Sequence, residues 1–327
     1  MLGHLAKRLA YYLVMLVAAV FLAYLLAATT LSPRAHFQER QPRPPAEQVD
    51  KQLAALGLDD RVPVLSRFGD WAAGAVRGDL GKSISGTSVS AEFGRRIGVS
   101  LRLLVIGTVL GTTVGVAAGA WSAVRQYQIS DRILTLGSFL LLSMPTFLVA
   151  VLLKTGALAL NDITGTQVIA FTGEVSPGVS GGLTELRDRL VHLVLPTCSI
   201  ALFGIASYSR YQRSTMLDVL GSPYLRTAAA KGLRRRTVVW RHGLRVALIP
   251  MATFFSFGFL GLLTGATFTE KIFGWHGMGE WFIDSINNND VHAVVAVNVF
   301  AAVTVLAAGF CSDLLLVALD PRVRGAG

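Results

Sequence analysis

The sequence places few side chains where they could carry out chemistry. Asp313 is the one acidic residue well inside a predicted apolar span, and acids at that depth are often functional. A proton relay would need partner groups at a similar depth, and the sequence offers none. Two interpretations of Asp313 stay open: a structural pair with loop arginines, or a coupling role.

Other candidate motifs lack the context that their chemistry needs. Gly81-Lys82-Ser83 resembles the end of a phosphate-binding loop, but the full pattern requires glycine where Val76 stands. Cys198 and Cys311 lie in apolar runs, form no CxxC pair, and are expected to be buried. The histidines are scattered singly, at positions 4, 36, 192, 242, 276 and 292. We therefore predict a non-catalytic chain that binds no metal or cofactor of its own.

The composition indicates a membrane protein. Of the 327 residues 52% are hydrophobic and 15% are charged, whereas soluble domains carry about 25% charged residues. The net charge is +10, but the basic residues lie mostly in loops between apolar runs, which membrane topology explains without a nucleic-acid partner.

Apolar runs of the length needed to cross a bilayer recur along the chain. Backbone polar groups in lipid must be satisfied internally, so each run should be an α-helix. The first run is too long for a signal-peptide core. We predict an all-α polytopic membrane protein with six transmembrane helices, at about 9–31, 99–123, 132–158, 190–210, 246–269 and 292–319.

Charge asymmetry predicts the orientation. Lys and Arg concentrate in loop 210–245 and in the C-terminal tail, whereas loops 159–189 and 270–291 are richer in acids. Because short basic loops stay inside, both termini should be cytoplasmic. We therefore expect a multi-pass protein of the cytoplasmic membrane.

The division of the chain follows from these spans. We predict an N-terminal transmembrane helix (1–31), an extracytoplasmic loop (32–98), a five-helix core (99–319) that includes the cytoplasmic loop 212–245, and a cytoplasmic tail (320–327). The long loop should form a small cap. It should contain one helix from Pro45 to a stop at Gly57 and an amphipathic helix from Val64 to Val76.

The second span carries glycines at four-residue spacing, which places them on one helix face. Such a stripe lets two helix backbones approach closely. It could serve static packing or form a sliding surface in a moving core. The glycines are Gly107, Gly111, Gly115 and Gly119.

Loop 212–245 is long, basic and not of low complexity. Its segment Tyr224–Leu233 predicts a short helix that begins at Pro223 and ends at Gly232. A short helix held between two spans suits docking on another protein.

The segment Tyr-Leu-Arg-Thr-Ala-Ala-Ala-Lys-Gly-Leu at 224–233 resembles the conserved loop of ABC importer permeases. More narrowly, it resembles the B-type permease subunit of dipeptide and oligopeptide importers. Further segments resemble that subgroup in order along the chain: Arg77–Gly81 with Ser83, Ser143–Phe147, Arg241–Arg245 with Ile249-Pro250, Glu270–Gly279 and Asp320–Arg324.

The resemblance implies a type I ABC importer permease fold and a division of labour. The chain would form half of the translocation path for peptides. Its partners would be a second homologous permease, two ATPase subunits that carry ATP and Mg, and an extracytoplasmic substrate-binding protein. The loop positions that would contact the ATPase are Arg226, Thr227, Ala228, Ala230, Lys231 and Gly232.

Departures from the family pattern leave the substrate open. Arg226-Thr227-Ala228 stands where the general motif has Glu-Ala-Ala, Thr146 and His276 replace more familiar residues, and 176–182 is an extra stretch. Another small solute, such as glutathione or a nickel chelate, is the alternative. A stand-alone secondary transporter would show inverted repeats or intramembrane ion sites, and the sequence shows neither clearly.

Overall fold

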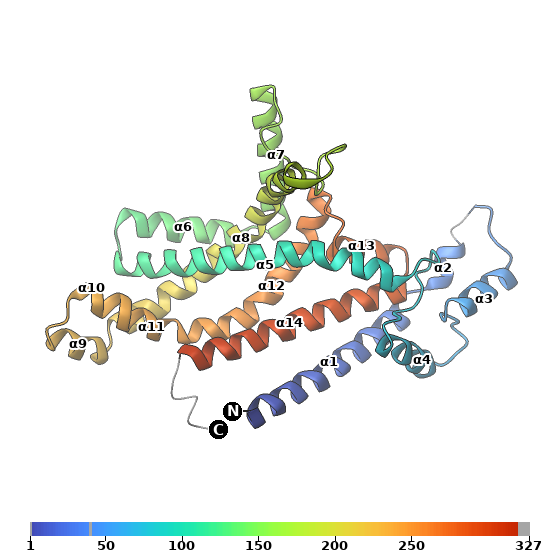
Figure 1. The fold of residues 1–327 in the computed structure, drawn as a ribbon, viewed down its shortest axis with the longest axis horizontal. Coiled ribbons are helices and arrows are strands. Elements are labelled where there is room, and N and C mark those ends of the chain that lie inside the picture. The colour runs from blue at the N-terminus through green and yellow to red at the C-terminus, as the bar shows by residue number, and fades with distance from the viewer. Residues whose placement is uncertain (1, 39–40, 320–327) are drawn as a thin grey trace. The chain divides into compact units, whose positions relative to one another are not determined.

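The computed structural model describes residues 2–38 and 41–319, and this part of the chain is helical (Figure 1). Its extended pairing is one isolated antiparallel bridge between Lys82 and Ser88. The C-terminal motif 320–324 and the predicted tail lie outside the described residues. The helices are α1 (Leu2–Thr30), α2 (Pro33–Gln38), α3 (Ala46–Ala55), α4 (Val64–Val76), α5 (Val89–Val124), α6 (Ile129–Ser143), α7 (Thr146–Thr164), α8 (Gly182–Leu220), α9 (Pro223–Ala230), α10 (Arg235–Thr237), the π-helix η1 (Val238–Gly243), α11 (Leu244–Ala247), α12 (Ile249–Phe273), α13 (Met278–Asn287) and α14 (Val291–Leu319).

Helices long and apolar enough to cross a membrane dominate the described chain. Five segments qualify alone, and the bent pair Arg235–Ser256 and Gly261–Phe273, with a 53° bend, brings the count to as many as six. This result agrees with the fold class predicted from the sequence. The five are Ala10–Gln38, Val89–Val124, Thr146–Thr164, Gly182–Leu220 and Val291–Leu319.

The third predicted span is not one continuous helix. The prediction of a single helix over 132–158 was wrong, because the chain breaks between α6 and α7, where Met144 is extended (ψ 142°). The ring of Pro145 disfavours a helical conformation at the preceding residue. The apolar stretch of the sequence continues through this point, so hydropathy alone does not detect the break.

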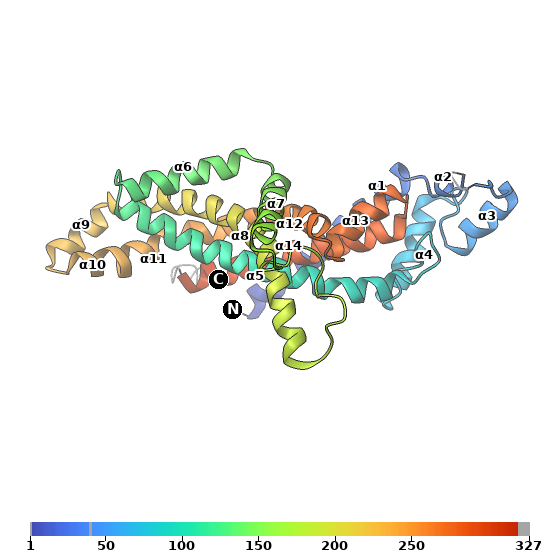
Figure 2. The same ribbon diagram turned by 90° about the horizontal axis from the view of Figure 1, so that it is seen from above.

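The chain divides into two compact units. The larger unit contains Arg102–Trp275 and the end of α14 from Ala307, and the smaller unit contains Leu2–Leu101 and His276–Leu306. In the larger unit, α8 packs against α6, α7 and α12. Figures 1 and 2 both show α9 and α10 at the end of this unit where α5 ends and α6 begins.

The smaller unit has its own hydrophobic core. Phe68 and Trp71 of α4 pack against Tyr24 of α1, with ring centroids 5.4 and 5.5 Å from the Tyr24 ring. Leu53 of α3 and Val295 of α14 are fully buried in the same cluster. The two helices predicted in the long loop are confirmed as α3 and α4.

The exposure of the two cysteines differs from the prediction. Cys198 and Cys311 are both free and both exposed on the isolated chain. The prediction that they are buried was wrong, because the surface of a membrane-spanning helix is itself apolar. An apolar neighbourhood in sequence therefore does not show which way such a side chain faces.

Candidate functional site

The segment between α8 and α12 forms the predicted short helix. Ser222 stands at the N-cap of α9 and Pro223 at its first position, where its missing N–H costs no hydrogen bond. At the other end the N–H of Lys231 donates to the Thr227 carbonyl (3.2 Å), and that of Gly232 to the Ala229 carbonyl (3.0 Å). Gly232 has φ +80°, a conformation that glycine adopts without strain. The predicted start and stop of this helix are confirmed.

One side chain anchors α9 to the larger unit. Leu225 is 4% exposed, and its Cδ1 lies only 3.2 Å from where a Cβ on Gly243 would stand. The hydroxyl of Tyr224 lies 3.3 Å from Nδ1 of His242. Both contacts join α9 to η1, whose Val238 and Val239 are buried. The helix is therefore held along one face.

The opposite face of α9 is open. Its open positions carry mostly small or basic side chains, and the Thr227 hydroxyl donates to the Pro223 carbonyl within the helix (3.0 Å). Such a surface lets another protein approach the backbone closely and offers positive charge to acidic groups. Among the loop positions singled out from the sequence, Ala228 is half-buried and the exposed ones are Arg226, Thr227, Ala230, Lys231 and Gly232.

An ion pair fixes the base of this region. Arg213 of α8 donates from Nε to Oδ1 of Asp131 (2.7 Å) and from a terminal nitrogen to Oδ2 (2.9 Å). The Ser122 hydroxyl and the Tyr127 N–H also donate to this carboxylate. The Arg213 guanidinium holds the pKa of Asp131 well below its usual range. The pair ties the start of α6 to α8 beside the point where α5 ends.

Replacing Asp131 with asparagine should destabilise the larger unit by roughly 2–3 kcal/mol, because a buried charge-assisted pair loses its anion. The depressed pKa sets the pH dependence. The carboxylate stabilises the fold above its ordinary pKa of about 4, and this contribution is lost as pH falls through the lower native value. Thermal unfolding of the detergent-solubilised chain should show a constant deficit from pH 6 to 8. The exposed Asp218→Asn is the control, and equal unfolding midpoints for the two variants would refute the assignment.

The glycine stripe lies against α8. A Cβ at Gly107 would stand 2.8 Å from Cγ2 of Ile200, and one at Gly111 would stand 3.2 Å from Cα of Gly204. At Gly115 the nearest atom is Cβ of Tyr208 at 2.8 Å, and at Gly119 it is the Ser209 carbonyl oxygen at 2.3 Å. Of these four positions, Gly119 near the end of α5 makes the closest approach to α8.

Two features escaped sequence reasoning. The partners Asp131 and Arg213 are 82 residues apart, and nothing in their local sequence links them. Lys154, inside α7, donates from Nζ to the carbonyl of Ile272 at the end of α12 (2.5 Å). A lysine in an otherwise apolar segment was the available signal.

Asp313 is half-buried on α14.

The family of the chain can now be assigned. Residues 115–325 match the model of the binding-protein-dependent transport system inner membrane component. The chain belongs to this family. Family membership and the helical fold confirm the permease subunit of an ABC importer that the loop motif indicated. This inner membrane component is the non-catalytic part of an importer that also comprises other subunits.

Full-length relatives agree with the assignment. The oligopeptide transport system permease protein OppB of Mycobacterium tuberculosis (strain H37Rv) is 54% identical over 325 residues, with 99% of each chain covered. The permease AppB of Bacillus subtilis is 32% identical, with 86% of this chain and 87% of AppB covered. The dipeptide transport system permease protein DppB of Escherichia coli K12 is 32% identical, with 83% and 84% covered.

A solved structure supports the fold of this ABC permease. The inward-facing MetNI methionine ABC transporter matches with a TM-score of 0.50 at 15% identity, over 70% of this chain and 96% of that chain. Among the described residues, no three His, Cys, Asp or Glu side chains form a group that could hold a metal ion.

Proposed function

We propose that this permease forms half of the path by which an ABC importer carries peptides into the cell. The relatives named for oligopeptide and dipeptide transport support the substrate class. A peptide has a polar backbone and needs a transient aqueous path, which two permease subunits enclose between them. The second half is a homologous permease, and an extracytoplasmic binding protein delivers the peptide.

The exposed face of α9 is the observation that carries the mechanism. In this proposal loop 212–245 lies on the cytoplasmic side and seats α9 in a groove of an ATPase subunit, which holds ATP and Mg. Closure of the ATPase pair then moves α9, and with it η1 and α8. Thr227, Ala228 and Ala230 allow close approach, Lys231 and Arg226 meet acidic groups, and Gly232 turns the chain away.

The remaining assignments of the sequence follow from this topology. Both termini are cytoplasmic, 1–31 is a transmembrane helix, 32–98 is an external cap, 99–319 is the transport core and 320–327 is the tail. The glycines of α5 hold it against α8, either as static packing or as a surface that slides. Asp313 either pairs structurally or couples the movement of α14.

An uptake panel tests the substrate class. A strain that lacks this chain is complemented with it and supplied with labelled dipeptides, pentapeptides, glutathione and a nickel chelate. Peptide uptake restored by the wild type, and abolished when the ATPase is inactivated, is the expected result. Restoration of glutathione or nickel uptake alone would replace peptides as the substrate, and uptake independent of the ATPase would favour a stand-alone transporter.

A further inference from the structure

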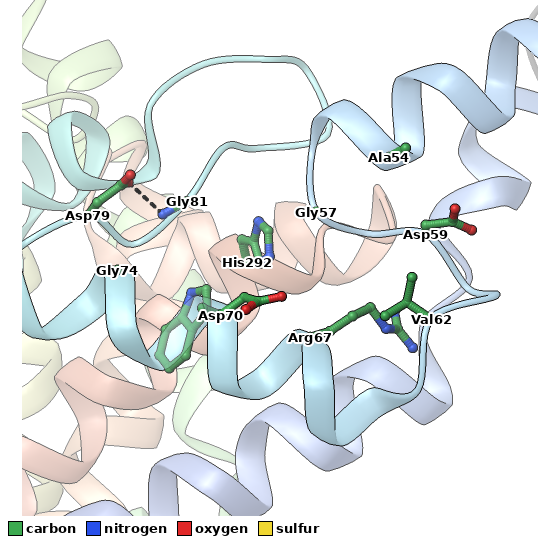
Figure 3. A pocket seen from close by; sticks show the side chains of 11 residues that line it. Ala54, Gly57, Asp59, Val62, Arg67, Asp70, Gly74, Asp79, Gly81 and His292 are labelled. Atoms are coloured by element: carbon green, nitrogen blue, oxygen red, sulfur yellow. Dashed lines mark hydrogen bonds between the residues drawn. The ribbon is translucent and has the colours of Figure 1, made fainter.

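The smaller unit contains a pocket of about 370 Å³ that the proposed transport path does not use (Figure 3). Its walls come from α3, the segment between α3 and α4, α4, the segment after α4 and the start of α14. Pockets of this size hold small ligands. Charged side chains line the pocket, and their charges decide which ligands it can bind.

Arg67 of α4 is a buried cation for which the described part of the chain offers no hydrogen bond or ion pair. It lines the pocket and is 9% exposed, and its Nε has no hydrogen-bond acceptor. Within residues 2–38 and 41–319 no carboxylate forms an ion pair with it. Burying a charge is costly unless an opposite charge or hydrogen-bond acceptors compensate it. An anionic group that enters the pocket would supply both.

Acidic side chains line the same pocket. Asp70 lies one turn beyond Arg67 on α4, and in Figure 3 both side chains leave the helix on the side where His292 lies. Asp79 accepts a hydrogen bond from the Gly81 N–H (2.9 Å) with one of its oxygens. Asp59 is already engaged by Arg61 (3.0 Å). The lining therefore offers one cation and two carboxylates, which repel a simple anion but suit a ligand with both charges.

One wall is fixed before any ligand binds. Nδ1 of His292 donates to the Lys82 carbonyl (2.9 Å), because a carbonyl oxygen can only accept, and the ring is 4% exposed. Gly81, with φ +89°, passes so close that a Cβ there would stand 2.8 Å from Nδ1. In the neutral ring, Nε2 is left as an acceptor. A fixed wall reduces the entropy lost on binding.

We propose that this pocket binds a small zwitterion, a free α-amino acid or a dipeptide. The ligand carboxylate pairs with Arg67, and its ammonium group lies near Asp70 and Asp79. The site lies in the smaller unit, where the proposed external cap meets the start of α14. Binding at this site needs neither α9 nor an ATPase. The proposal can therefore be tested separately from the proposed function.

Calorimetric titration of the detergent-purified full-length chain tests the proposal. The ligands are leucine, dialanine, N-acetyl-dialanine and dialanine amide. Saturable binding of leucine or of dialanine is expected and tells the two sources apart. If dialanine binds, removing either of its charges should weaken binding at least about tenfold, which corresponds to roughly 1.4 kcal/mol. Absence of saturable heat with both free ligands, or equal affinity for the capped forms, would overturn the proposal.

Variants locate the site within the chain. Arg67→Gln should weaken binding of the zwitterion about tenfold or more, whereas the exposed Arg77→Gln should leave it unchanged. Asp70 is exposed, so Asp70→Asn should not disturb folding. It should weaken binding of dialanine while leaving the residual affinity for N-acetyl-dialanine unaltered. A folded Arg67→Gln or Asp70→Asn chain with wild-type affinity would contradict the assignment of the charges.

Discussion

Replacing Gly119 with leucine should prevent α5 and α8 from packing as they do in the native chain. Even a Cβ at this position would stand 2.3 Å from the Ser209 carbonyl oxygen, 2.9 Å from Cβ of Gln212 and 3.0 Å from the Arg213 nitrogen. Two of these atoms are backbone, which cannot rotate away, so the helices themselves must separate. Overpacking of a tight contact costs about 1–3 kcal/mol and occasionally more, and we expect Gly119→Leu to reach or exceed the upper figure.

The measurement is thermal unfolding and membrane abundance. Gly119→Ala should lower the unfolding midpoint by roughly 5–10 °C, and Gly119→Leu should accumulate poorly. Gly137→Ala is the matched control, because a Cβ at Gly137 meets nothing within 4 Å. A Gly119→Leu chain with native abundance and an unchanged midpoint would show that α5 and α8 do not approach each other in this way.

Replacing Gly232 with valine should severely reduce ATP-driven uptake while leaving the chain abundant. Gly232 has φ +80°, and a side chain there meets nothing within 4 Å, so the penalty comes from the backbone and not from packing. Non-glycine residues in the left-handed region cost roughly 1–2 kcal/mol, and β-branched residues cost more. The backbone at position 232 should therefore leave the left-handed conformation. This change misplaces the neighbouring Lys231 on the proposed docking face.

Uptake of labelled peptide in cells, normalised to the amount of permease in the membrane, measures this effect. We expect a loss on the order of tenfold or more for Gly232→Val and a smaller loss for Gly232→Ala. Gly221→Ala is the control, because Gly221 has φ −79°, which alanine adopts freely. Normal uptake by Gly232→Val at normal abundance would remove the proposed role of this turn.

Local rules predicted the short helices well. Pro45 and Gly57 bound α3, Pro223 and Gly232 bound α9, and the apolar spacing in 64–76 indicated α4, because these signals act within a few residues. The same rules predict a helix break before Pro145, but the prediction of one helix over 132–158 followed hydropathy instead. Helix boundaries in membrane proteins follow such backbone constraints as well as apolar length.

Contacts between distant segments were beyond local rules. The amphipathic pattern of α4 did not indicate that Phe68 and Trp71 would meet Tyr24 of α1, or that Arg67 would be buried. The Asp131–Arg213 pair likewise depends on how α6 and α8 pack. The glycine spacing in α5 predicted a close helix contact, but α8 as its partner emerged only from the fold.

Photo-crosslinking from α9 tests the central claim most directly. A photoreactive amino acid replaces the exposed Ala229, and the same substitution at the exposed Leu183 of α8, on the side predicted to be external, serves as the control. Illumination of the assembled importer in membranes should yield an adduct between position 229 and the ATPase subunit, identified by peptide mass, and none from position 183. An ATPase adduct from position 183, or no ATPase adduct from position 229, would contradict the account.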